Sequence, residues 1–402
     1  MNYAPTRDFS SGTTAFARVQ VATTRDIESL EAAWRQFETT AVCHVFQTYE
    51  VLSAWCRHVA PKENIEPVFV TGTGEDGRLL YLLPLGTRRK LASRTVEWLG
   101  GDQADYHGGL FDEAYLRHLA GDRSAFDAFM TGFVEAIGGA DVLHFAKMPT
   151  DLRGTANPFL QLRTYPNANG AHATRLEPDW NTYYESKRGK GWRRTDRSKE
   201  RQLSEHGELS FVIAEDRATA DAILDAIFAQ KREGLARIGV DDMFAPPGVA
   251  DFYRQLAHGS VDPDSVVQLS ALYCGDRIAA ANFGLVFADT YYYVLHSYDL
   301  DTFARYSPGR QLMYRLMQWS FDKELALFDF TIGDEGYKDN WCEVPIELVD
   351  SAVALTSAGA ATSGAFRLWQ RTKRGIKQND RLWSAVVETR KALLNLRRGD
   401  SA

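Results

Sequence analysis

The segment around Ser307 combines the residues of a helix start with those of an anion site. Ser is favoured as the N-cap of a helix and Pro at its first position, so a helix is predicted to begin at Pro308. Apolar residues from Leu312 onward recur at helical spacing. The first turn of such a helix has unpaired backbone N–H groups and the positive end of the helix dipole, and Gly309 leaves space beside them. This arrangement suits a pyrophosphate; the alternative is a well-capped helix without a ligand.

Reactive side chains also follow the strand predicted at 325–332. The loop after this strand holds two acids, a phenol and an amine, which are Asp334, Glu335, Tyr337 and Lys338. Side chains of these types take and give protons when they converge on a substrate. Alternation along the strand places Asp329 within an apolar segment, where a buried carboxylate needs a partner. A structural anchor and a catalytic role are both open for Asp329.

Two further segments carry candidate side chains. His296 lies in the aromatic strand predicted at 290–298 and is either a base or a hydrogen-bonded core residue. The polar loop that contains Asp105, Tyr106 and His107 is either part of a substrate site or a plain surface turn.

A run of basic residues lies between Lys187 and Arg201 and includes Arg193 and Arg194. Most such runs are solvated faces of helices. The functional alternative is a face that binds the phosphates of a cofactor or donor. Both interpretations are open from the sequence.

The elements that must position these residues indicate helices around an antiparallel sheet. Helical patterns at 218–237 and 249–257 precede three closely spaced strands that end at residue 298. This order predicts an α+β fold. A length of 402 residues predicts two domains at roughly 150 residues per domain. The G-x-G-x-x-G at 72–77 lies between two predicted strands, which indicates a hairpin turn because the dinucleotide-binding motif must open a helix.

Net charge divides the chain into an acidic body and a basic tail. Residues 363–402 hold ten basic and three acidic residues, a net +7, and since the whole chain is −7 the remainder is −14. An acidic body disfavours phosphate backbones, so we expect no DNA partner. Tryptophans and aliphatic residues interleave with the basic residues of the tail. This predicts a basic amphipathic helix that binds an anionic membrane surface, an anionic nucleotide or the acidic body itself.

The sequence lacks the motifs of membrane spans, signal peptides and common metal sites, and this leads to expectations about compartment and metal content. The sequence has no apolar run near the roughly 20 residues that cross a bilayer and no signal-peptide pattern at its start. We therefore expect a cytoplasmic protein, peripheral at the inner face of the membrane if the tail binds lipid. No C-x-x-C pair and no H-E-x-x-H motif occurs, so no metal is expected.

The motifs of the second half resemble the acetyltransferase domain of the GNAT superfamily. The resemblance is to the form found in cellulose-biosynthesis-associated and other polysaccharide-modifying proteins, which are related to the Fem-type aminoacyl transferases. It is densest from Trp180 to Trp341 and looser in the N-terminal half, and residues from 363 lie outside it. The motifs that carry it are the strand 291–298, Ser307-Pro308-Gly309, Phe328-Asp329-Phe330, Gly333-Asp334-Glu335 and Tyr337-Lys338.

The resemblance implies tandem GNAT-like domains at 15–175 and 176–355, followed by a basic amphipathic helical tail at 363–402. It implies acetyl-CoA as the acyl donor, held where the central strands splay apart. Its pyrophosphate would lie at the start of the helix that begins at Pro308. The cofactor-binding residues implied in this way are Arg305, Ser307, Gly309, Arg310 and Gln311.

The resemblance also implies direct attack of an amine on a thioester. His296, Asp334 or Glu335 would act as the base, and Tyr337 would protonate the departing thiolate. Lys338 would bind an anionic group of the substrate or polarise an oxygen. The residues expected to bind the acceptor are Asp105, Tyr106, His107, Arg193 and Arg194.

The function expected from this reading is an acyl-CoA-dependent N-acetyltransferase. Its acceptor would be an amino sugar of an exopolysaccharide or of its lipid-linked precursor. One alternative is a Fem-type transferase that uses aminoacyl-tRNA, in which the run from Lys187 to Arg201 would contact RNA. Another is a non-catalytic GNAT-fold sensor or scaffold that acts through the basic tail.

Overall fold

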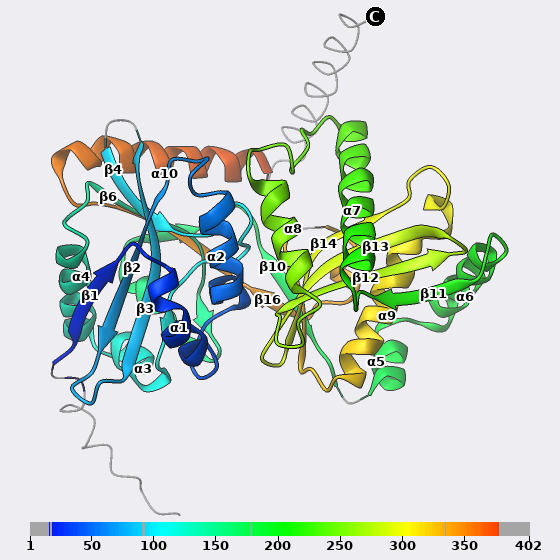
Figure 1. The fold of residues 1–402 in the computed structure, drawn as a ribbon, viewed down its shortest axis with the longest axis horizontal. Coiled ribbons are helices and arrows are strands. Elements are labelled where there is room, and N and C mark those ends of the chain that lie inside the picture. The colour runs from blue at the N-terminus through cyan, green and yellow to red at the C-terminus, as the bar shows by residue number, and fades with distance from the viewer. Residues whose placement is uncertain (1–15, 17, 91–92, 178, 334, 378–402) are drawn as a thin grey trace, which may run out of the picture.

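The computed structural model describes residues 16, 18–90, 93–177, 179–333 and 335–377. Within them the chain forms two units side by side, each a mostly antiparallel sheet flanked by helices (Figure 1). The α+β fold expected from the order of helices and strands is confirmed.

The sheet of the first unit has the order β1-β2-β3-β4-β6-β17-β9, with β5 paired to β3. Its strands are β1 (Gln20–Thr24), β2 (Glu66–Thr73), β3 (Leu79–Lys90), β4 (Ser93–Trp98), β5 (Leu110–Phe111), β6 (Val142–Pro149), β9 (Thr164–Pro166) and β17 (Leu348–Ala354). Its helices are α1 (Glu31–Glu38), α2 (Tyr49–His58), α3 (Glu113–Gly121) and α4 (Arg123–Ala136), and a small hairpin is formed by β7 (Asp151–Leu152) and β8 (Thr155–Ala156).

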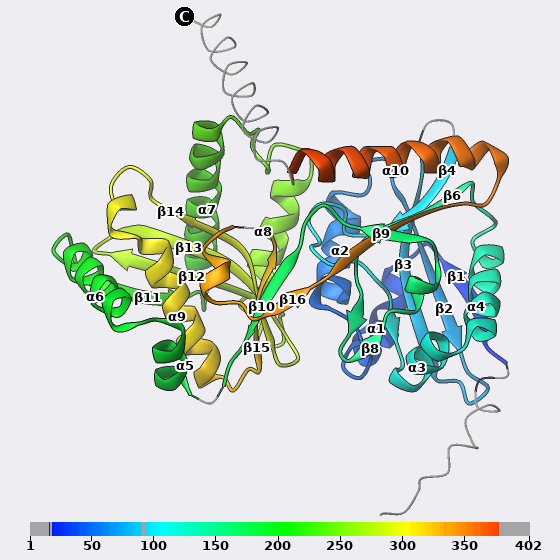
Figure 2. The ribbon, with the colours of Figure 1, turned by 180° about the vertical axis from the view of Figure 1, so that it is seen from behind.

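The sheet of the second unit has the order β11-β12-β13-β14-β15-β10-β16. Its strands are β10 (Ala171–Arg175), β11 (Leu209–Ile213), β12 (Val267–Cys274), β13 (Arg277–Phe287), β14 (Thr290–Tyr298), β15 (Leu327–Ile332) and β16 (Val344–Ile346). The helices α7 (Arg217–Ile238) and α8 (Val249–Gly259) cover one face, and α5 (Trp180–Lys187), α6 (Lys190–Ser204) and α9 (Pro308–Asp322) lie on the other (Figure 2).

Both units have the same strand topology. In each sheet four antiparallel strands lead to one parallel pair, β4 with β6 in the first unit and β14 with β15 in the second. A helix precedes the second strand of each pair, α4 in the first unit and α9 in the second. The fold is therefore a tandem repeat, as the resemblance to the GNAT superfamily implied.

Each sheet contains one strand from the part of the chain that was expected to form the other domain. β17 lies between β6 and β9 in the first sheet, and β10 lies between β15 and β16 in the second. Residues 348–354, expected in the second domain, therefore belong to the first sheet, and residues 171–175, expected in the first domain, belong to the second. Neither strand was expected from the sequence, which contains no signal for partners so distant along the chain.

The exchanged strands connect units that also share an apolar core. Phe46 of the first unit packs edge-on against Tyr292 of β14, with ring centroids 5.8 Å apart. Trp34, Trp55 and Phe252 are buried in the same cluster. A continuous core and exchanged strands hold the units in one fixed arrangement, which matters because a cavity described below lies between them.

The glycine-rich segment at 72–77 is a hairpin turn. The amide of Gly77 donates to the carbonyl of Gly74 at 3.0 Å, and Gly77 has a φ of 79°. The segment joins β2 to β3 and opens no helix. The hairpin predicted from the sequence is confirmed.

The helix α10 (Ser357–Lys377) contains the described part of the predicted tail and crosses the first unit (Figure 1). Ser363 Oγ donates to the Ala352 carbonyl at 2.7 Å, and the ring of Phe366 stacks on His144 with centroids 4.1 Å apart. The side chains of Leu368 and Trp369 remain 67% and 65% exposed. This segment therefore packs on the body. Residues 378–402 lie outside the described structure, and binding of a membrane or a nucleotide by the tail stays a prediction.

Among the described residues, no helix combines the length and the apolar character needed to cross a bilayer.

Candidate active site

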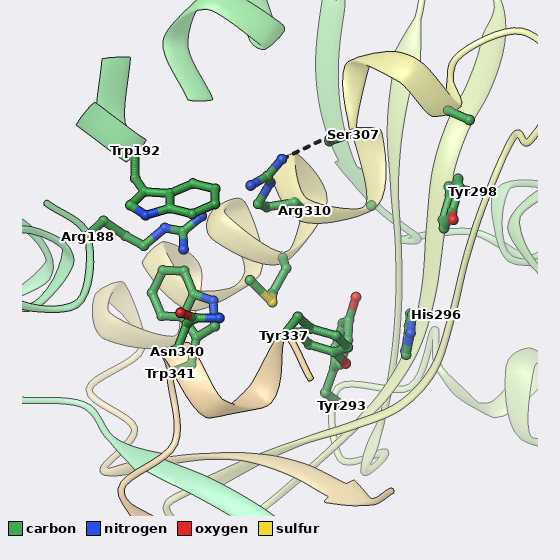
Figure 3. Close-up of a pocket in the computed structure, with 13 residues that line it drawn as sticks. Arg188, Trp192, Tyr293, His296, Tyr298, Ser307, Arg310, Tyr337, Asn340 and Trp341 are labelled. Atoms are coloured by element: carbon green, nitrogen blue, oxygen red, sulfur yellow. Dashed lines mark hydrogen bonds between the residues drawn. The ribbon is translucent and has the colours of Figure 1, made fainter. Parts of the chain in front are cut away.

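A gap between two parallel strands forms the centre of the candidate site. β14 and β15 pair only over Thr290–Tyr292 and Leu327–Asp329, and beyond these residues the strands separate. A cavity of about 390 Å³ borders this gap on the side of α9. This volume is within the usual range for small-molecule sites. We call it the helix cavity; its lining includes Arg188, Trp192, Tyr293, His296, Tyr298, Gly309, Arg310, Met313, Tyr337 and Trp341 (Figure 3).

The first turn of α9 points unpaired amides toward the helix cavity. The amides of Gly309 and Arg310 donate to no group in the described part of the chain, whereas the amide of Gln311 donates to the Ser307 carbonyl at 3.3 Å. Two of the three amides predicted to hold a pyrophosphate are thus unpaired. Gln311 is buried and its Nε2 donates to the Tyr306 carbonyl, so this residue supports the loop.

Ser307 is the N-cap residue, as predicted, but its side chain does not cap the helix. The backbone of Ser307 is left-handed, with a φ of 58° and a ψ of 51°. Its hydroxyl accepts a hydrogen bond from Arg310 Nη2 at 3.0 Å, shown in Figure 3, instead of bonding to a helix amide. The expected serine cap is therefore wrong, and the left-handed turn leaves the amides that follow uncovered.

The corresponding helix of the first unit shows the contrast. At the start of α4 the Asp122 carboxylate accepts hydrogen bonds from the amides of Ser124 and Ala125 at 2.8 and 3.2 Å. A carboxylate therefore occupies the position that an anionic ligand would need. Of the two helices in this topological position, only α9 is open to an anion.

Two arginines and one buried carboxylate set the charge of the helix cavity. Arg310 Nη1 and Arg188 Nη2 lie 3.5 and 3.6 Å from opposite oxygens of Asp196, which is 6% exposed. Two guanidinium groups share one carboxylate, so the cluster carries a net positive charge. Arg188 also lies between Trp192 and Trp341, with its guanidinium carbon 4.7 and 5.3 Å from the ring centres (Figure 3). Together with the helix dipole, this charge favours an anion at the start of α9.

A second cavity, of about 200 Å³, lies between the two units. We call it the interface cavity; residues that line it include Asp105, Lys231, Tyr253, Glu335 and Lys338. Tyr293 and His296 line both cavities. The gap between β14 and β15 therefore has one cavity on each side, and these two aromatic residues lie at the boundary.

His296 is an uncharged imidazole at this boundary. Its ring stacks on Tyr293 with centroids 4.8 Å apart, and its buried Nδ1 has no hydrogen-bond partner among the described residues. Burial, reinforced by the charges of Lys231 and Lys338, lowers the pKa of His296 to about 3. A group with so low a pKa is a weak base at neutral pH, although its free nitrogen can accept a hydrogen bond.

Asp105 brings a carboxylate from the first unit to the interface cavity. The Thr331 hydroxyl and the Ile332 amide lie close to it at the end of β15. Thr331 has a φ of 57°, a conformation that a β-branched residue rarely adopts and that is often found at functional sites. Burial raises the pKa of Asp105, while Lys147, the Thr331 hydroxyl and the Ile332 amide act in the opposite direction.

The loop after β15 divides its predicted catalytic residues between the cavities. Tyr337 lines the helix cavity and its buried hydroxyl has no partner among the described residues. Lys338 is 2% exposed and donates to the carbonyls of Thr331, Ile332 and Gly333 at 3.1–3.3 Å, and Glu335 pairs with it at 2.9 Å. Lys338 therefore holds the end of β15 in place through these bonds, and its ammonium group is not free to bind a substrate. Asp334 lies outside the described residues.

The remaining predicted residues lie away from the gap. Arg305 is exposed, stacks on Tyr306 and does not line the helix cavity. His107 is 6% exposed, and its Nδ1 lies 3.1 Å from the Ala146 carbonyl. Arg193 pairs with Glu185, and Arg194 is exposed. The structure therefore does not bring these four residues together with His296, and their binding roles stay predictions.

Three of the eight basic residues between Lys187 and Arg201 form ion pairs with described residues. Lys187 pairs with Glu343, Arg193 pairs with Glu185, and Arg188 pairs with Asp196, as described above. These pairs reduce the positive field that an RNA backbone would require, but they leave most of the run uncompensated. Contact of this run with tRNA stays a prediction.

Tyr106 forms a buried contact between the two units. Its hydroxyl donates to both carboxylate oxygens of Asp329, at 2.8 and 3.0 Å, and the Thr331 amide donates to the same carboxylate at 2.7 Å. Both side chains are almost fully buried. This geometry favours the structural anchor predicted for Asp329, and it places Tyr106 in the scaffold beside the interface cavity.

The Asp329 contact predicts a pH dependence of stability. Burial raises the pKa of Asp329 to about 7, whereas an unfolded aspartate titrates near about 3.9. The folded state thus binds the proton more tightly, so the free energy of unfolding falls as pH rises from about 4 to about 7. Asp329→Asn removes this dependence, which urea unfolding at pH 5 and pH 8 measures. Equal pH dependence in the wild type and the variant would contradict the assignment; exposed Asp102→Asn is the control.

Three residues of the site had not been singled out from the sequence. Tyr298 and Trp192 line the helix cavity, and Lys231 lines the interface cavity. Tyr298 belongs to the aromatic strand next to His296, so period-2 alternation was a usable signal. Trp192 and Lys231 lie on helices that only the tertiary fold brings to the site. In the described residues no group of three or more His, Cys, Asp or Glu side chains could hold a metal ion.

Comparisons with known proteins identify the domain that carries the site. Residues 190–339 match the family model of the acetyltransferase (GNAT) domain. The crystal structure of FemX is similar with a TM-score of 0.56 and 11% identity, covering 80% of this chain and 96% of that one. A conserved protein of unknown function from Bacteroides thetaiotaomicron VPI-5482 gives 0.52 and 10%, covering 84% and 100%. No curated protein sequence matches this chain.

These likenesses concern the fold and the GNAT domain. Residues 190–339 include α6, α9, β14, β15 and most of the helix cavity. The helix cavity therefore lies mostly within the matched domain, whereas Asp105 of the interface cavity lies outside it. The narrower resemblance to cellulose-associated proteins stays a prediction.

Proposed function

We propose that this chain is an N-acyltransferase that moves an acetyl group from acetyl-CoA to an amino group. The acceptor we propose is an amino sugar of an exopolysaccharide or of its lipid-linked precursor. The observation that carries the proposal is the pair of unpaired amides at Gly309 and Arg310, which face a cavity beside a gap between parallel strands. The match of residues 190–339 to the GNAT domain supports the same activity.

The start of α9 fits the pyrophosphate of coenzyme A. Its amides, the Arg310 guanidinium and the Arg188 guanidinium supply donors and positive charge at one end of the helix cavity. The apolar walls, which include Met313 and Tyr293, suit the pantetheine arm that follows. Acetyl-CoA supplies an activated thioester when it is bound. The role of the residues here is to hold the acyl group at the gap between β14 and β15.

The amine would enter from the interface cavity and reach the acyl group beside His296. We propose that the carboxylate of Asp105 removes the amine proton, because its raised pKa makes it a better base than His296. The free nitrogen of His296 accepts a hydrogen bond that orients the amine. As the C–N bond forms the C–S bond breaks, and the sulfur takes a proton from Tyr337.

Tyr337 suits the role of the acid. Its hydroxyl is buried in the helix cavity without a described partner, and burial raises the pKa of Tyr337 well above its usual value. The phenol therefore stays protonated at neutral pH, and the same burial raises the pKa of the departing thiol, so that the sulfur can accept the proton.

The function is tested by following release of the coenzyme A thiol from acetyl-CoA in the presence of glucosamine and other primary amines. We expect amine-dependent release, and we expect Tyr337→Phe to lower kcat by about 10²-fold with little change in the Kd for coenzyme A. Tyr273→Phe is the control, since it removes a hydroxyl from β12 that lines neither cavity. Absence of amine-dependent release, or an unchanged kcat in Tyr337→Phe, would contradict the mechanism.

A further inference from the structure

The charged groups of the interface cavity differ in whether other groups of the protein compensate their charge. Lys338 and Glu335 pair with each other at 2.9 Å, and Lys338 also donates to three carbonyls. Lys147 offsets the charge of Asp105 and lies 3.8 Å from Asp102, which also lines the cavity. These four charges thus have partners of opposite charge within the protein. Lys231, the fifth, is different.

Lys231 is a half-buried cation without a partner. It extends from α7 into the interface cavity, and its ammonium makes no hydrogen bond or ion pair with any residue that the structure describes. Glu335 is the carboxylate that acts on it, but Glu335 is already bound to Lys338. Burial lowers the pKa of Lys231, as expected for a charge taken out of water without a counter-charge. Partly buried charges are normally paired, so a ligand is the natural source of the missing anion.

The cavity therefore has charges of opposite sign on the walls that the two units contribute. Asp105 comes from the first unit and Lys231 from α7 of the second, and both line the same space. With Asp105 assigned to the amine, Lys231 remains for an anionic group on the same molecule. A volume of about 200 Å³ is below the range for drug-sized ligands, so the cavity holds a head group rather than a chain. One sugar ring with one anionic substituent is of suitable size.

We propose that the acceptor carries an anionic group near its amine and that Lys231 binds this group. The inference rests on the proposed acyl transfer and adds the chemical class of the acceptor. A phosphate and a carboxylate share the chemistry that Lys231 recognises, since each presents oxygens that accept from an ammonium. A lipid-linked amino sugar that carries a phosphate next to the ring is one member of this class.

Matched acceptors test the inference. Acetylation of glucosamine 6-phosphate is compared with that of glucosamine, and lysine is compared with cadaverine, so that one pair adds a phosphate and the other a carboxylate. In the wild type we expect kcat/KM to be about 10- to 100-fold higher for the anionic member of at least one pair, as for a hydrogen bond to a charged group. The pair that shows the preference identifies the type of anion.

Variants at Lys231 test whether this residue causes the preference for the anionic amine. Lys231→Met should reduce kcat/KM for the anionic amine to the value for its neutral partner and change the neutral partner less than about threefold. Lys231→Arg keeps the charge and should keep the preference, which separates loss of charge from loss of folding. Arg232→Met is the matched control, since Arg232 is the next residue on α7 and pairs outward with Asp242 at 2.8 Å.

The outcomes separate this inference from the proposed function. If neither anionic amine is preferred, or if Lys231→Met leaves the preference intact, the inference is wrong while amine acetylation still supports the function. If the wild type neither binds coenzyme A nor acetylates any amine, the proposed function is wrong and the inference falls with it. A preference that disappears in Lys231→Met and persists in Lys231→Arg and Arg232→Met supports both.

Discussion

Replacement of Gly309 by valine is expected to abolish binding of acetyl-CoA. A Cβ atom at Gly309 would lie 3.2 Å from the Tyr298 ring, and the two further methyl groups of valine would extend over the amides at the start of α9. The wild type should be stabilised by roughly 2.7 kcal/mol when the ligand is 100-fold above its Kd. Gly309→Val should lose this stabilisation. Thermal unfolding with and without acetyl-CoA measures the difference.

Gly191→Val is the matched control for this prediction. Gly191 follows the first residue of α6, as Gly309 follows the first residue of α9, and a Cβ at Gly191 meets nothing within 4 Å. Both variants add the same β-branched side chain at the same helical position. We expect Gly191→Val to bind acetyl-CoA as the wild type does. Both variants should unfold at the same temperature without ligand. If they do, normal binding of acetyl-CoA by Gly309→Val would show that acetyl-CoA does not bind at the start of α9.

Asp105→Asn is expected to reduce kcat by about 10²- to 10⁴-fold, the range for loss of a general base. The amide is nearly isosteric with the carboxylate, and its oxygen can still lie beside the Thr331 hydroxyl and the Ile332 amide. It cannot take the proton of the amine. Because Asp105 comes from the first unit, this result would show that catalysis requires both units. Steady-state kinetics with glucosamine at saturating acetyl-CoA measure the loss.

The pH profile distinguishes a base from a structural carboxylate. Activity of the wild type should fall at acidic pH as Asp105 is protonated, with an apparent pKa above the usual aspartate value because burial raises the pKa of Asp105. This acidic limb should disappear in Asp105→Asn, while the Kd for coenzyme A stays unchanged. A variant with the same acidic limb as the wild type would assign the base to another residue. Asp105→Glu, which keeps a carboxylate, should retain more activity than Asp105→Asn.

Local signals in the sequence predicted where α9 begins, which is where we propose that the donor binds. Pro308 begins α9 as expected, since proline at the first helical position is a local preference. The hairpin at 72–77 and the burial of Asp329 within its strand followed from short-range patterns in the same way. Each of these features depends on residues within about one turn or one strand of one another, whereas the partner of Asp329, Tyr106, comes from the other unit. The sequence was sufficient for them.

Long-range contacts explain what the sequence could not show. The left-handed turn at Ser307 places its hydroxyl on Arg310 instead of on a helix amide, whereas the sequence alone predicts an ordinary serine cap. Lys338 is a polar loop residue in the sequence, but the turn at Thr331 directs it back onto three carbonyls. The exchange of β10 and β17 and the arrival of Lys231 at the interface cavity need the whole fold. The sequence therefore did not identify the residues of the site that act across the two units.

The most direct test of the central claim is a crystal structure of the full chain with coenzyme A. We predict that the pyrophosphate oxygens lie within about 3 Å of the amide nitrogens of Gly309 and Arg310. The pantetheine arm should enter the gap between β14 and β15 and end beside His296. A diphosphate bound elsewhere, with the start of α9 closed by side chains, would contradict the account.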